Sequence, residues 1–361
     1  MKPFFSIIVP CCDVEPYVRE CLMSVINQPF HDWECLIGIE TSKDRTEEVV
    51  HEIIDGDERF KVFTGPRSGS CSASRNTGID IAQGEYVIFL DGDDTIVDGS
   101  LQRLHDKIVA RSGADIYPCA MLVLNEMTGQ YEQTRDNYPK DFNEEIRGPE
   151  AILMSYSHSR LHSYTGFPCP MLQLSVFRRE YLVSNNLKCI YGLRRQDSEF
   201  APRALYWAKR VIPLHEAFYV YRIRTQSIST IAKGMTSFLG DYAIILKSLL
   251  AFHAEVSAQN GFDRRISSMW AKHWLTWVYY NWFYPQNIRK ASRERRLETL
   301  KVAFANGFDN FDCLVKASTL PRRIAAWWVK IFVRYRLGAW LADFFFIYAY
   351  YPLTGIRDKI K

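Results

Sequence analysis

The sequence predicts a doubly wound α/β fold for its first part. Short apolar runs alternate with segments whose apolar residues recur every three or four positions, which is typical of a parallel sheet with helices on both faces. The clearest strand is Tyr86–Leu90, an uninterrupted aromatic and β-branched run that ends abruptly in Asp91, Asp93 and Asp94. Ligands of open α/β sheets bind beyond the carboxyl ends of the strands, so these acidic residues mark a candidate site. The alternative is a solvated acidic turn that caps the next helix.

Each earlier element has its own signal. Pro10 closes a first apolar strand, Pro29 ends the amphipathic helix after it, and Gly84 stops the helix before the Tyr86 strand. The predicted strands are Phe4–Val9, Cys35–Ile39 and Lys61–Phe63, and the predicted helices run from Val14 to Ile26, from Val49 to Ile54, and through Ile79 and Ile81. Right-handed crossovers bring the carboxyl ends of the strands to one edge. Glu40, Arg75 and the Asp91 turn are therefore expected to gather in one crevice.

The sequence beyond residue 110 carries weaker signals. We interpret Ala114–Leu124 as another pair of buried strands, and Asn125–Arg147 as a surface hairpin, with a mobile loop over the site as the alternative. Cys169–Phe177 predicts a strand that leads into Arg178–Leu182. Asp197 begins a helical segment, a position where an acidic residue also serves as a cap or first-turn acid.

Composition limits the class of protein. A chain of 361 residues suggests about two domains, and contents of 47% hydrophobic and 14% aromatic residues exclude a disordered chain. The net charge of +4 is too small to indicate nucleic-acid binding. The nine cysteines lack the spacing of a zinc site or a disulfide framework, which fits a reducing compartment. With no signal peptide and no uncharged run long enough to span a bilayer, a cytoplasmic protein is expected, either soluble or at the membrane surface.

Four stretches keep an order and spacing that chance does not readily produce. They are Ser6–Pro10, Glu20–Gln28, Ser74–Gly78 and Gly84–Asp94. Together they resemble the family 2 glycosyltransferases of the GT-A fold, and the resemblance runs nearly continuously to about Leu104. It implies a Rossmann-like, mostly parallel twisted sheet flanked by helices, a nucleotide-sugar donor, a metal at the Asp-x-Asp motif, and inversion at the anomeric carbon.

The resemblance assigns donor-site roles by position. Pro10 starts the loop next to the base, Glu40 stands where an Asp usually contacts the base, and Arg75 stands where an Arg lines the donor pocket. Asp91 falls near the ribose, and Asp93 is the usual metal ligand. These two carboxylates would hold Mg²⁺ or Mn²⁺ together with the donor diphosphate, because both ions prefer hard oxygen ligands.

Two later motifs extend the resemblance. The family's Glu-Asp pair reads Gln-Asp here, and Asp197 becomes the implied general base, which must reach the acceptor hydroxyl; Glu199 is the second candidate. Ala217–Ser229 resembles the family's Tyr-x-Tyr-Arg…Ser-Ile-Ser segment, in which Arg222 and Arg224 would stabilise the leaving diphosphate. A basic edge strand is the alternative for this segment.

The sequence also departs from the family pattern. Ile39–Ser42 replaces the usual Asp-Asp-Gly-Ser loop, and Cys12-Asp13 replaces the usual Tyr-Asn. The aromatic face that often stacks on the base is therefore missing, which bears on the identity of the nucleotide more than on the reaction.

The expected organisation is a catalytic domain followed by a helical one. The GT-A domain is expected at 1–232, with a nucleotide-binding half at 1–110 and an acceptor half at 111–232, and an α-helical, aromatic and basic domain at 233–361. Helical periodicity runs from Phe238 to Phe252, and the aromatic stripe from Trp270 to Tyr284 is interpreted as core. Basic residues with Trp and Phe follow from Pro321, with a further aromatic run at Asp343–Tyr351. This C-terminal part either lies in the membrane interface or packs on itself or on a second subunit of a homodimer.

The resemblance implies an inverting, metal-dependent transferase. It would move a sugar from a nucleoside-diphosphate sugar, expected to be a UDP-sugar, to a saccharide or lipid-linked saccharide in surface-polysaccharide (capsule) synthesis at the inner face of the membrane. A nucleotidyltransferase is disfavoured because Pro10–Asp13 is not a glycine-rich phosphate loop. A catalytically inactive sugar- or membrane-binding scaffold of the same fold is the remaining alternative, suggested by Cys12, Ile39 and Gln196.

Overall fold

The computed structural model describes residues 2–136, 138–139, 142–158, 172–224, 239–267, 269–270, 324 and 327. The chain divides into two compact units, one of residues 1–159 and 169–231 and the other of residues 160–168 and 232–361. The predicted division into donor and acceptor halves at residue 110, and the predicted domain boundary after residue 232, stay predictions.

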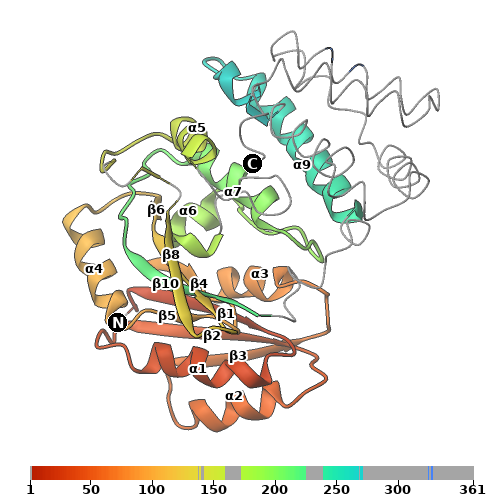
Figure 1. Cartoon of the computed structure of the whole chain (residues 1–361). Coiled ribbons are helices and arrows are strands. Elements are labelled where there is room, and N and C mark those ends of the chain that lie inside the picture. Colours follow the sequence, from red (N-terminus) through yellow and green to blue (C-terminus); the bar gives the residue numbers. More distant parts are fainter. Residues whose placement is uncertain are drawn as a thin grey trace. The chain divides into compact units, whose positions relative to one another are not determined.

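A six-stranded sheet with the order β3-β2-β1-β4-β9-β6 forms the centre of the first unit (Figure 1). Its strands are β1 (Phe5–Cys11), β2 (Trp33–Glu40), β3 (Phe60–Gly65), β4 (Tyr86–Phe89), β6 (Ile116–Pro118) and β9 (Ser175–Arg178). The first four are mutually parallel, whereas β9 runs antiparallel to both β4 and β6. The predicted mixed, mainly parallel sheet is confirmed.

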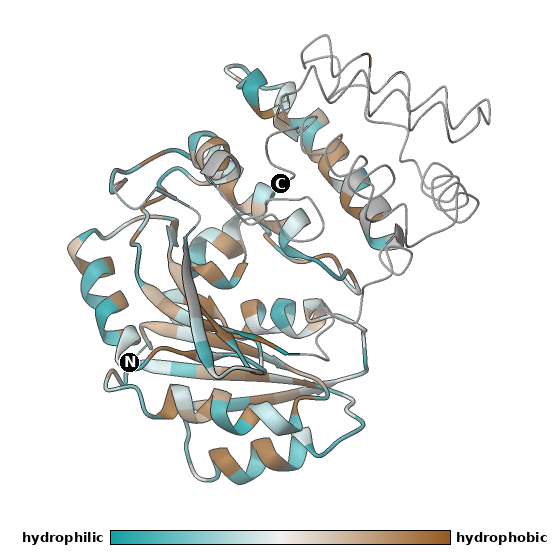
Figure 2. Cartoon of the chain, in the orientation of Figure 1, coloured by the Kyte–Doolittle hydropathy of each residue, from teal (hydrophilic) through white to brown (hydrophobic). Residues whose placement is uncertain are grey.

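Crossover helices cover both faces of this sheet. α1 (Glu15–Ile26) and α2 (Thr46–Ile54) lie on one face in Figure 1, and α3 (Ser72–Ile81) lies on the other. The buried residues of α1 are Val18, Cys21, Leu22 and Val25, which have the spacing of one helix face. Figure 2 shows mainly apolar strands between helices in which apolar and hydrophilic residues alternate. Burial of this apolar face stabilises the layers.

Close packing of α3 positions a functional side chain. Gly78 faces β1 so closely that a Cβ there would lie 2.5 Å from Ile8 Cγ2, so only glycine allows this approach. Arg75 precedes Gly78 by one turn on the same helix face and is only 4% exposed. The close contact between α3 and β1 thus places the Arg75 guanidinium at the edge of the sheet where the strands end.

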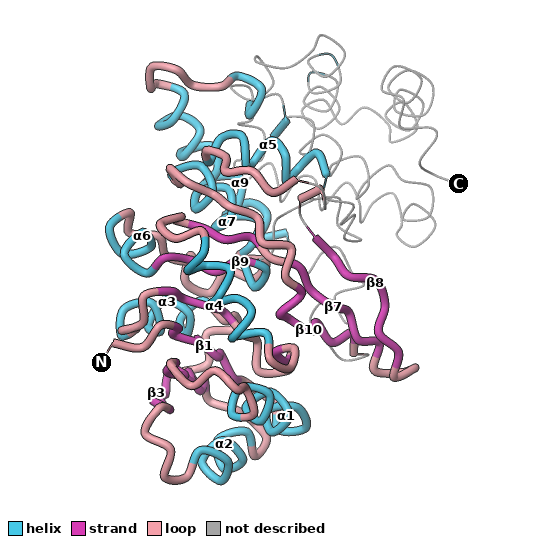
Figure 3. The backbone as a smooth tube through the Cα atoms, turned by 90° about the vertical axis from the view of Figure 1, so that its left-hand side faces the viewer, coloured by secondary structure: helices cyan, strands magenta, loops and turns pink. Residues whose placement is uncertain are grey.

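A second, four-stranded sheet has the order β5-β10-β7-β8. Its strands are β5 (Thr95–Ile96), β7 (Ala120–Asn125), β8 (Gln130–Asp136) and β10 (Ala217–Ile223). β7 and β8 form a hairpin, and Figure 3 shows β10 beside them. The hairpin predicted at Asn125–Arg147 thus begins earlier in the chain, because its first strand β7 lies in the segment predicted to form buried strands. Because β10 pairs with both β5 and β7, the alternative interpretation of its segment as an edge strand is wrong.

The remaining described elements of this unit are helical. They are α4 (Ser100–Ala110), α5 (Gly148–His158), the 3₁₀ turn η1 (Leu172–Leu174), α6 (Arg179–Ser184) and α7 (Asp197–Trp207). The prediction of one strand at Cys169–Phe177 is wrong for part of its described residues, because Leu172–Leu174 forms a 3₁₀ turn and strand β9 begins at Ser175. The turn frees the Leu172 N–H from sheet pairing, and this N–H meets Asp197 instead.

In the second unit, α9 (Leu239–Ser257) confirms the helix predicted from Phe238 to Phe252 over its described part. Ile245, Leu249, Phe252 and Val256 are its buried apolar residues. The predicted aromatic stripe beyond Trp270, the basic segment Asn287–Arg296 and the run Asp343–Tyr351 lie outside the described residues. Of the basic aromatic segment after Pro321 only Ile324 and Trp327 are described, and both are exposed. No helix within the described ranges has the length and apolar character to cross a bilayer.

Candidate active site

The turn after β4 approaches β1 closely. Gly92 N–H donates to Pro10 O at 3.3 Å, and a Cβ on Gly92 would lie 3.0 Å from Cys11 Sγ. A side chain at position 92 would press on Cys11 and Pro10, which favours the glycine inside the acidic motif. The contact places Pro10 beside the turn, while its predicted role next to a nucleotide base stays a prediction.

Asp91 is the centre of a largely buried polar cluster. Its Oδ1 accepts from Arg75 Nη2 at 2.5 Å and its Oδ2 accepts from Gln173 Nε2 at 2.7 Å. Arg75 Nη1 also donates to Gln196 Oε1 at 3.2 Å. The structure therefore joins the predicted Arg75 and Asp91, and it adds two amide side chains that the sequence analysis did not select. Little solvent reaches the pair to screen it, which strengthens the attraction between the two charges.

Asp93 pairs with one of the predicted arginines. Its Oδ2 lies 2.7 Å from Arg224 Nη2, and the two side chains are 22% and 16% exposed. Burial and the nearby Asp91 carboxylate raise the pKa of Asp93, and Arg224 opposes this rise. The net rise means that Asp93 lies where further positive charge is electrostatically favourable.

Asp94 has a structural role in the same turn. Its Oδ2 accepts from the Tyr219 hydroxyl at 2.5 Å and its Oδ1 accepts from the Arg222 N–H at 2.7 Å. Burial, followed by the charges of Asp93 and Asp91, raises the pKa of Asp94 well above its ordinary value. These bonds attach the acidic turn to β10 of the second sheet.

Arg222 holds the turn from the other side. Its Nε donates to Asp93 O at 3.1 Å and its Nη2 donates to Glu20 Oε2 at 2.6 Å. The guanidinium carbons of Arg222 and Arg224 lie 5.4 Å and 4.8 Å from the centre of the Tyr17 ring, within cation–π range. Tyr17 and Glu20 were not predicted as site residues, although their spacing of three residues on α1 puts both on one helix face. The contact of Arg222 with the leaving diphosphate stays a prediction. In the structure, this side chain supports the turn.

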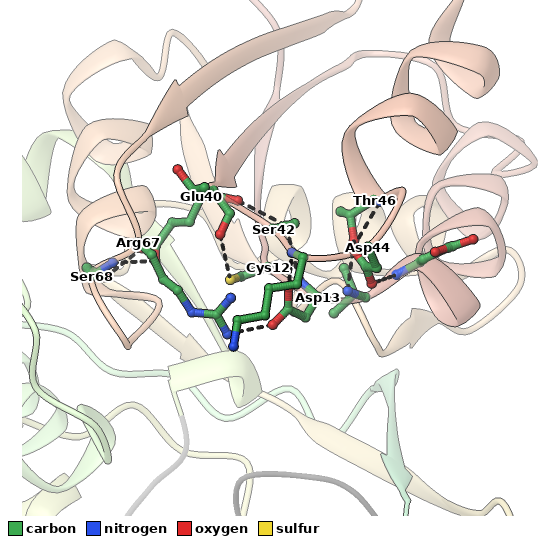
Figure 4. A network of polar contacts seen from close by, with 12 residues as sticks. Cys12, Asp13, Glu40, Ser42, Asp44, Thr46, Arg67 and Ser68 are labelled. Carbon is green, nitrogen blue, oxygen red and sulfur yellow. Dashed lines mark hydrogen bonds and ion pairs between the residues drawn. The ribbon is translucent and has the colours of Figure 1, made fainter.

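Three loops meet at the ends of β1, β2 and β3 (Figure 4). Glu40 accepts from the N–H and hydroxyl of Ser68 at 2.8 Å and 2.6 Å and is almost fully buried. Asp13 Oδ2 accepts from Arg67 Nη2 at 2.5 Å, and this bond is the main cause of the lowered pKa of Asp13. The predicted contact of Glu40 with a base stays a prediction, and Arg67 is a further residue of this site that was not predicted from the sequence.

Cys12 occupies the place where the family usually has a tyrosine. It is half-buried, and its Sγ lies 3.9 Å from Thr41 O. Asp13 follows with φ 52°, a left-handed conformation that Asp tolerates better than most residues. The Cys12 thiol and the neighbouring Arg67 guanidinium therefore line this loop, and Cys12 offers no aromatic ring that could stack on a base, as the sequence predicts.

Asp197 is the first residue of α7. Its Oδ1 accepts from Leu172 N–H at 3.0 Å. Burial raises the pKa of Asp197, while the charge of Arg75 opposes the rise. Gln196 before it binds Arg75, and Gln173 after Leu172 binds Asp91, so the predicted base is connected to the Asp91 cluster on both sides.

Glu199, the second candidate for the base, has a structural environment. It is 1% exposed, and Arg203 donates to both of its oxygens at 2.6 Å and 2.8 Å. We expect Glu199→Gln to destabilise the fold by up to about 3–5 kcal/mol, the range for breaking a buried ion pair. The folded fraction should keep most of its turnover. Thermal unfolding and activity per folded molecule measure the two effects, and a large loss of turnover with unchanged stability would contradict this assignment.

The carboxylate oxygens of the acidic turn suit a divalent cation that is also bound by a ligand such as a diphosphate. Within the described ranges, no three His, Cys, Asp or Glu side chains come together as a complete metal site. Mg²⁺ commonly uses only one or two carboxylates and completes its shell with water and substrate phosphates. Asp93 is the better placed of the two predicted ligands, because both oxygens of Asp91 already accept hydrogen bonds from protein groups.

Residues 6–180 match the model of glycosyl transferase family 2. The chain carries a family 2 glycosyltransferase domain. The glycosyltransferase EpsJ of Bacillus subtilis is 31% identical over 237 residues, which cover 64% of this chain and 64% of EpsJ. GalNAc(5)-diNAcBac-PP-undecaprenol beta-1,3-glucosyltransferase of Campylobacter jejuni is 25% identical over 238 residues, which cover 65% of this chain and 70% of that enzyme. The family recognised from the sequence is confirmed for residues 6–180.

Solved structures agree on the fold. The crystal structure of S. aureus TarS 1-349 in complex with UDP-GlcNAc has a TM-score of 0.65 and 19% identity, covering 92% of this chain and 88% of that one. The GT-A architecture predicted from the sequence is therefore confirmed. The match spans less than two thirds of several curated relatives, with 64% of EpsJ and 40% and 31% of glycosyltransferases from Haemophilus influenzae and Streptococcus pneumoniae.

Proposed function

We propose that the chain transfers a sugar from a UDP-sugar to a hydroxyl of a saccharide or lipid-linked saccharide, with inversion at the anomeric carbon. The observation that carries the proposal is the connected cluster of Arg75, Asp91 and Asp197, beside which Asp93 pairs with Arg224. This cluster supplies donor-binding charges and, in Asp197, a half-buried carboxylate for proton transfer. The neighbour TarS was crystallised with UDP-GlcNAc, and the Campylobacter relative is named for a lipid-linked acceptor, which supports both substrate classes.

Asp197 is the residue for proton transfer. A carboxylate whose pKa is raised by burial accepts a proton more readily once it is ionised, so it suits removal of the acceptor hydroxyl's proton. The Leu172 N–H bond to Oδ1 fixes the orientation of this carboxylate. Attack from the side opposite the departing nucleotide in a single displacement gives inversion.

The leaving side of the site is cationic. Arg224 is the more exposed arginine and is placed to meet the diphosphate, while Arg222 keeps the turn in position. Mg²⁺ or Mn²⁺ bound at Asp93 would supply further positive charge for the departing diphosphate. Arg75 holds Asp91 toward the donor side of the cluster.

Contact with the inner face of a membrane is part of this proposal. The exposed Ile324 and Trp327 belong to the basic aromatic segment, and such side chains favour a lipid interface. A lipid-linked acceptor would require the enzyme to work at that surface.

Turnover of the donor tests the proposal. Purified protein is incubated with UDP-Glc, UDP-GlcNAc, UDP-Gal or UDP-GalNAc and Mn²⁺, with and without extracted lipid-linked saccharide, and released UDP is measured. Release from one donor that the acceptor accelerates supports the transferase. Binding of a donor without any release under all conditions would favour the inactive scaffold instead.

A further inference from the structure

Gln173 is a buried amide that the sequence motifs do not include. It lies in η1, directly before the strand β9, and it is 6% exposed. Its Nε2 donates to Asp91 Oδ2 at 2.7 Å. The Asp91 carboxylate of the candidate donor site therefore holds this buried amide in place.

The chemistry of Asp91 fixes which way the amide faces. Arg75 Nη2 donates to Asp91 Oδ1 at 2.5 Å, and the Asp91 carboxylate accepts hydrogen bonds through both of its oxygens. Gln173 must therefore present its NH₂ group to Asp91. Its carbonyl oxygen then faces another direction, and the assignment does not depend on a choice between two equivalent amide orientations.

That oxygen has no partner among the residues that the structure describes. Gln173 Oε1 is buried and makes no hydrogen bond within the described part of the chain. Buried acceptors in native proteins are nearly always paired, and one left unpaired at a site calls for a donor from outside the protein. Arg75 Nε, in the same cluster, is also buried without a partner, so unpaired polar atoms gather here.

The neighbours of Gln173 show which part of a substrate could supply the donor. Leu172, the residue before it, binds the predicted base Asp197, and Gln173 itself binds Asp91. Gln173 thus connects the donor-binding carboxylate with the base. In a single displacement the transferred sugar lies between the departing diphosphate and the attacking hydroxyl.

We infer that Gln173 Oε1 accepts a hydrogen bond from a hydroxyl or acetamido N–H of the transferred sugar, which makes Gln173 a specificity-determining residue. The inference rests on the proposed function, because it needs a sugar between the two carboxylates. Gln173 has two roles in this account: its nitrogen positions Asp91, and its oxygen reads the sugar.

The test separates these two roles by comparing ligands. Dissociation constants of UDP, UDP-Glc and UDP-GlcNAc are measured by calorimetry with Mn²⁺ for the wild type and for Gln173→Met, which has nearly the same length and no polar atoms. The loss for UDP reports the positioning of Asp91. Any greater loss for the UDP-sugar reports the contact with the sugar itself. Thermal unfolding of the ligand-free variant confirms that it is folded.

We expect the preferred UDP-sugar to lose about tenfold more affinity than UDP, as for one hydrogen bond of about 1.4 kcal/mol. If only UDP-GlcNAc loses more affinity than UDP, the hydrogen bond to Gln173 comes from the acetamido N–H. If UDP-Glc loses as much affinity as UDP-GlcNAc, the hydrogen bond comes from a ring hydroxyl. Equal losses for UDP and both sugars would overturn the inference while leaving the proposed function intact. A wild type that binds UDP but neither UDP-sugar would overturn both.

Discussion

Replacing Asp197 with asparagine should reduce sugar transfer about 10²–10⁴-fold, the usual contribution of a general base, while donor affinity stays within about twofold. Asparagine keeps the shape of the side chain and an oxygen for the Leu172 N–H, so donor binding should survive. Turnover and calorimetric binding of the same donor measure the two quantities. Transfer at a near wild-type rate would show that another group removes the proton.

The same substitution has an expected effect on stability. Burial raises the folded-state pKa of Asp197 above its ordinary value of 3.8, so the ionised form disfavours the fold. This cost is absent below the unfolded-state pKa and appears as the pH rises through the folded-state pKa. We therefore expect Asp197→Asn to melt at or above the wild-type temperature at neutral pH, with the difference shrinking in acid. When the transfer rate of the wild type is measured against pH, its decline in acid should be centred at a higher pH than the pKa of an ordinary aspartate.

Replacing Asp93 with asparagine should abolish the Mn²⁺-dependent part of nucleotide binding. The substitution removes the negative charge from the acidic side chain of the turn that pairs with the half-buried Arg224. Titration of UDP with and without Mn²⁺ measures the effect. Asp98→Asn, which changes an exposed acid five residues further along, is the matched control and should bind like the wild type. A Mn²⁺ effect of wild-type size in Asp93→Asn would remove Asp93 from the metal site.

A substitution of Arg224 is expected to change the Mn²⁺ affinity of Asp93 in the opposite direction. Its Nη2 pairs with Asp93 Oδ2, so it competes with any cation for that oxygen. We expect Arg224→Gln to bind Mn²⁺ more tightly than the wild type in the absence of nucleotide, and UDP more weakly in the presence of Mn²⁺. Electron paramagnetic resonance of free Mn²⁺ gives the first quantity. Weaker Mn²⁺ binding by the variant would contradict the competition.

The parallel core could be predicted from the sequence because its signals are local. Each strand is a short apolar run, and Pro10, Pro29 and Gly84 mark element ends within a few residues. Arg75 and Asp91 could be placed together because parallel strands and their crossover helices converge on one edge. The η1 turn was missed, since Leu172–Leu174 is as apolar as a strand and its turn depends on a distant partner, Asp197.

The missed site residues have contacts that no local pattern reveals. Gln173 and Asp91 are 82 positions apart, and Glu20 and Arg222 are 202 apart. A single Gln or Tyr in an apolar segment carries no periodic signal, so such residues become visible only when the fold brings their partners to them. Arg67 is similar, because its role depends on the unusual Asp13 in a different loop.

Thermal unfolding with a panel of nucleotides tests the central claim most directly. UDP, GDP, CDP and their common sugars are added to the purified protein with and without Mn²⁺, because a ligand that binds the folded state raises its melting temperature by mass action. The proposed function predicts a rise with UDP and one UDP-sugar that depends on Mn²⁺ and is lost in Asp93→Asn. No rise with any nucleotide under any condition would contradict a donor site in this chain.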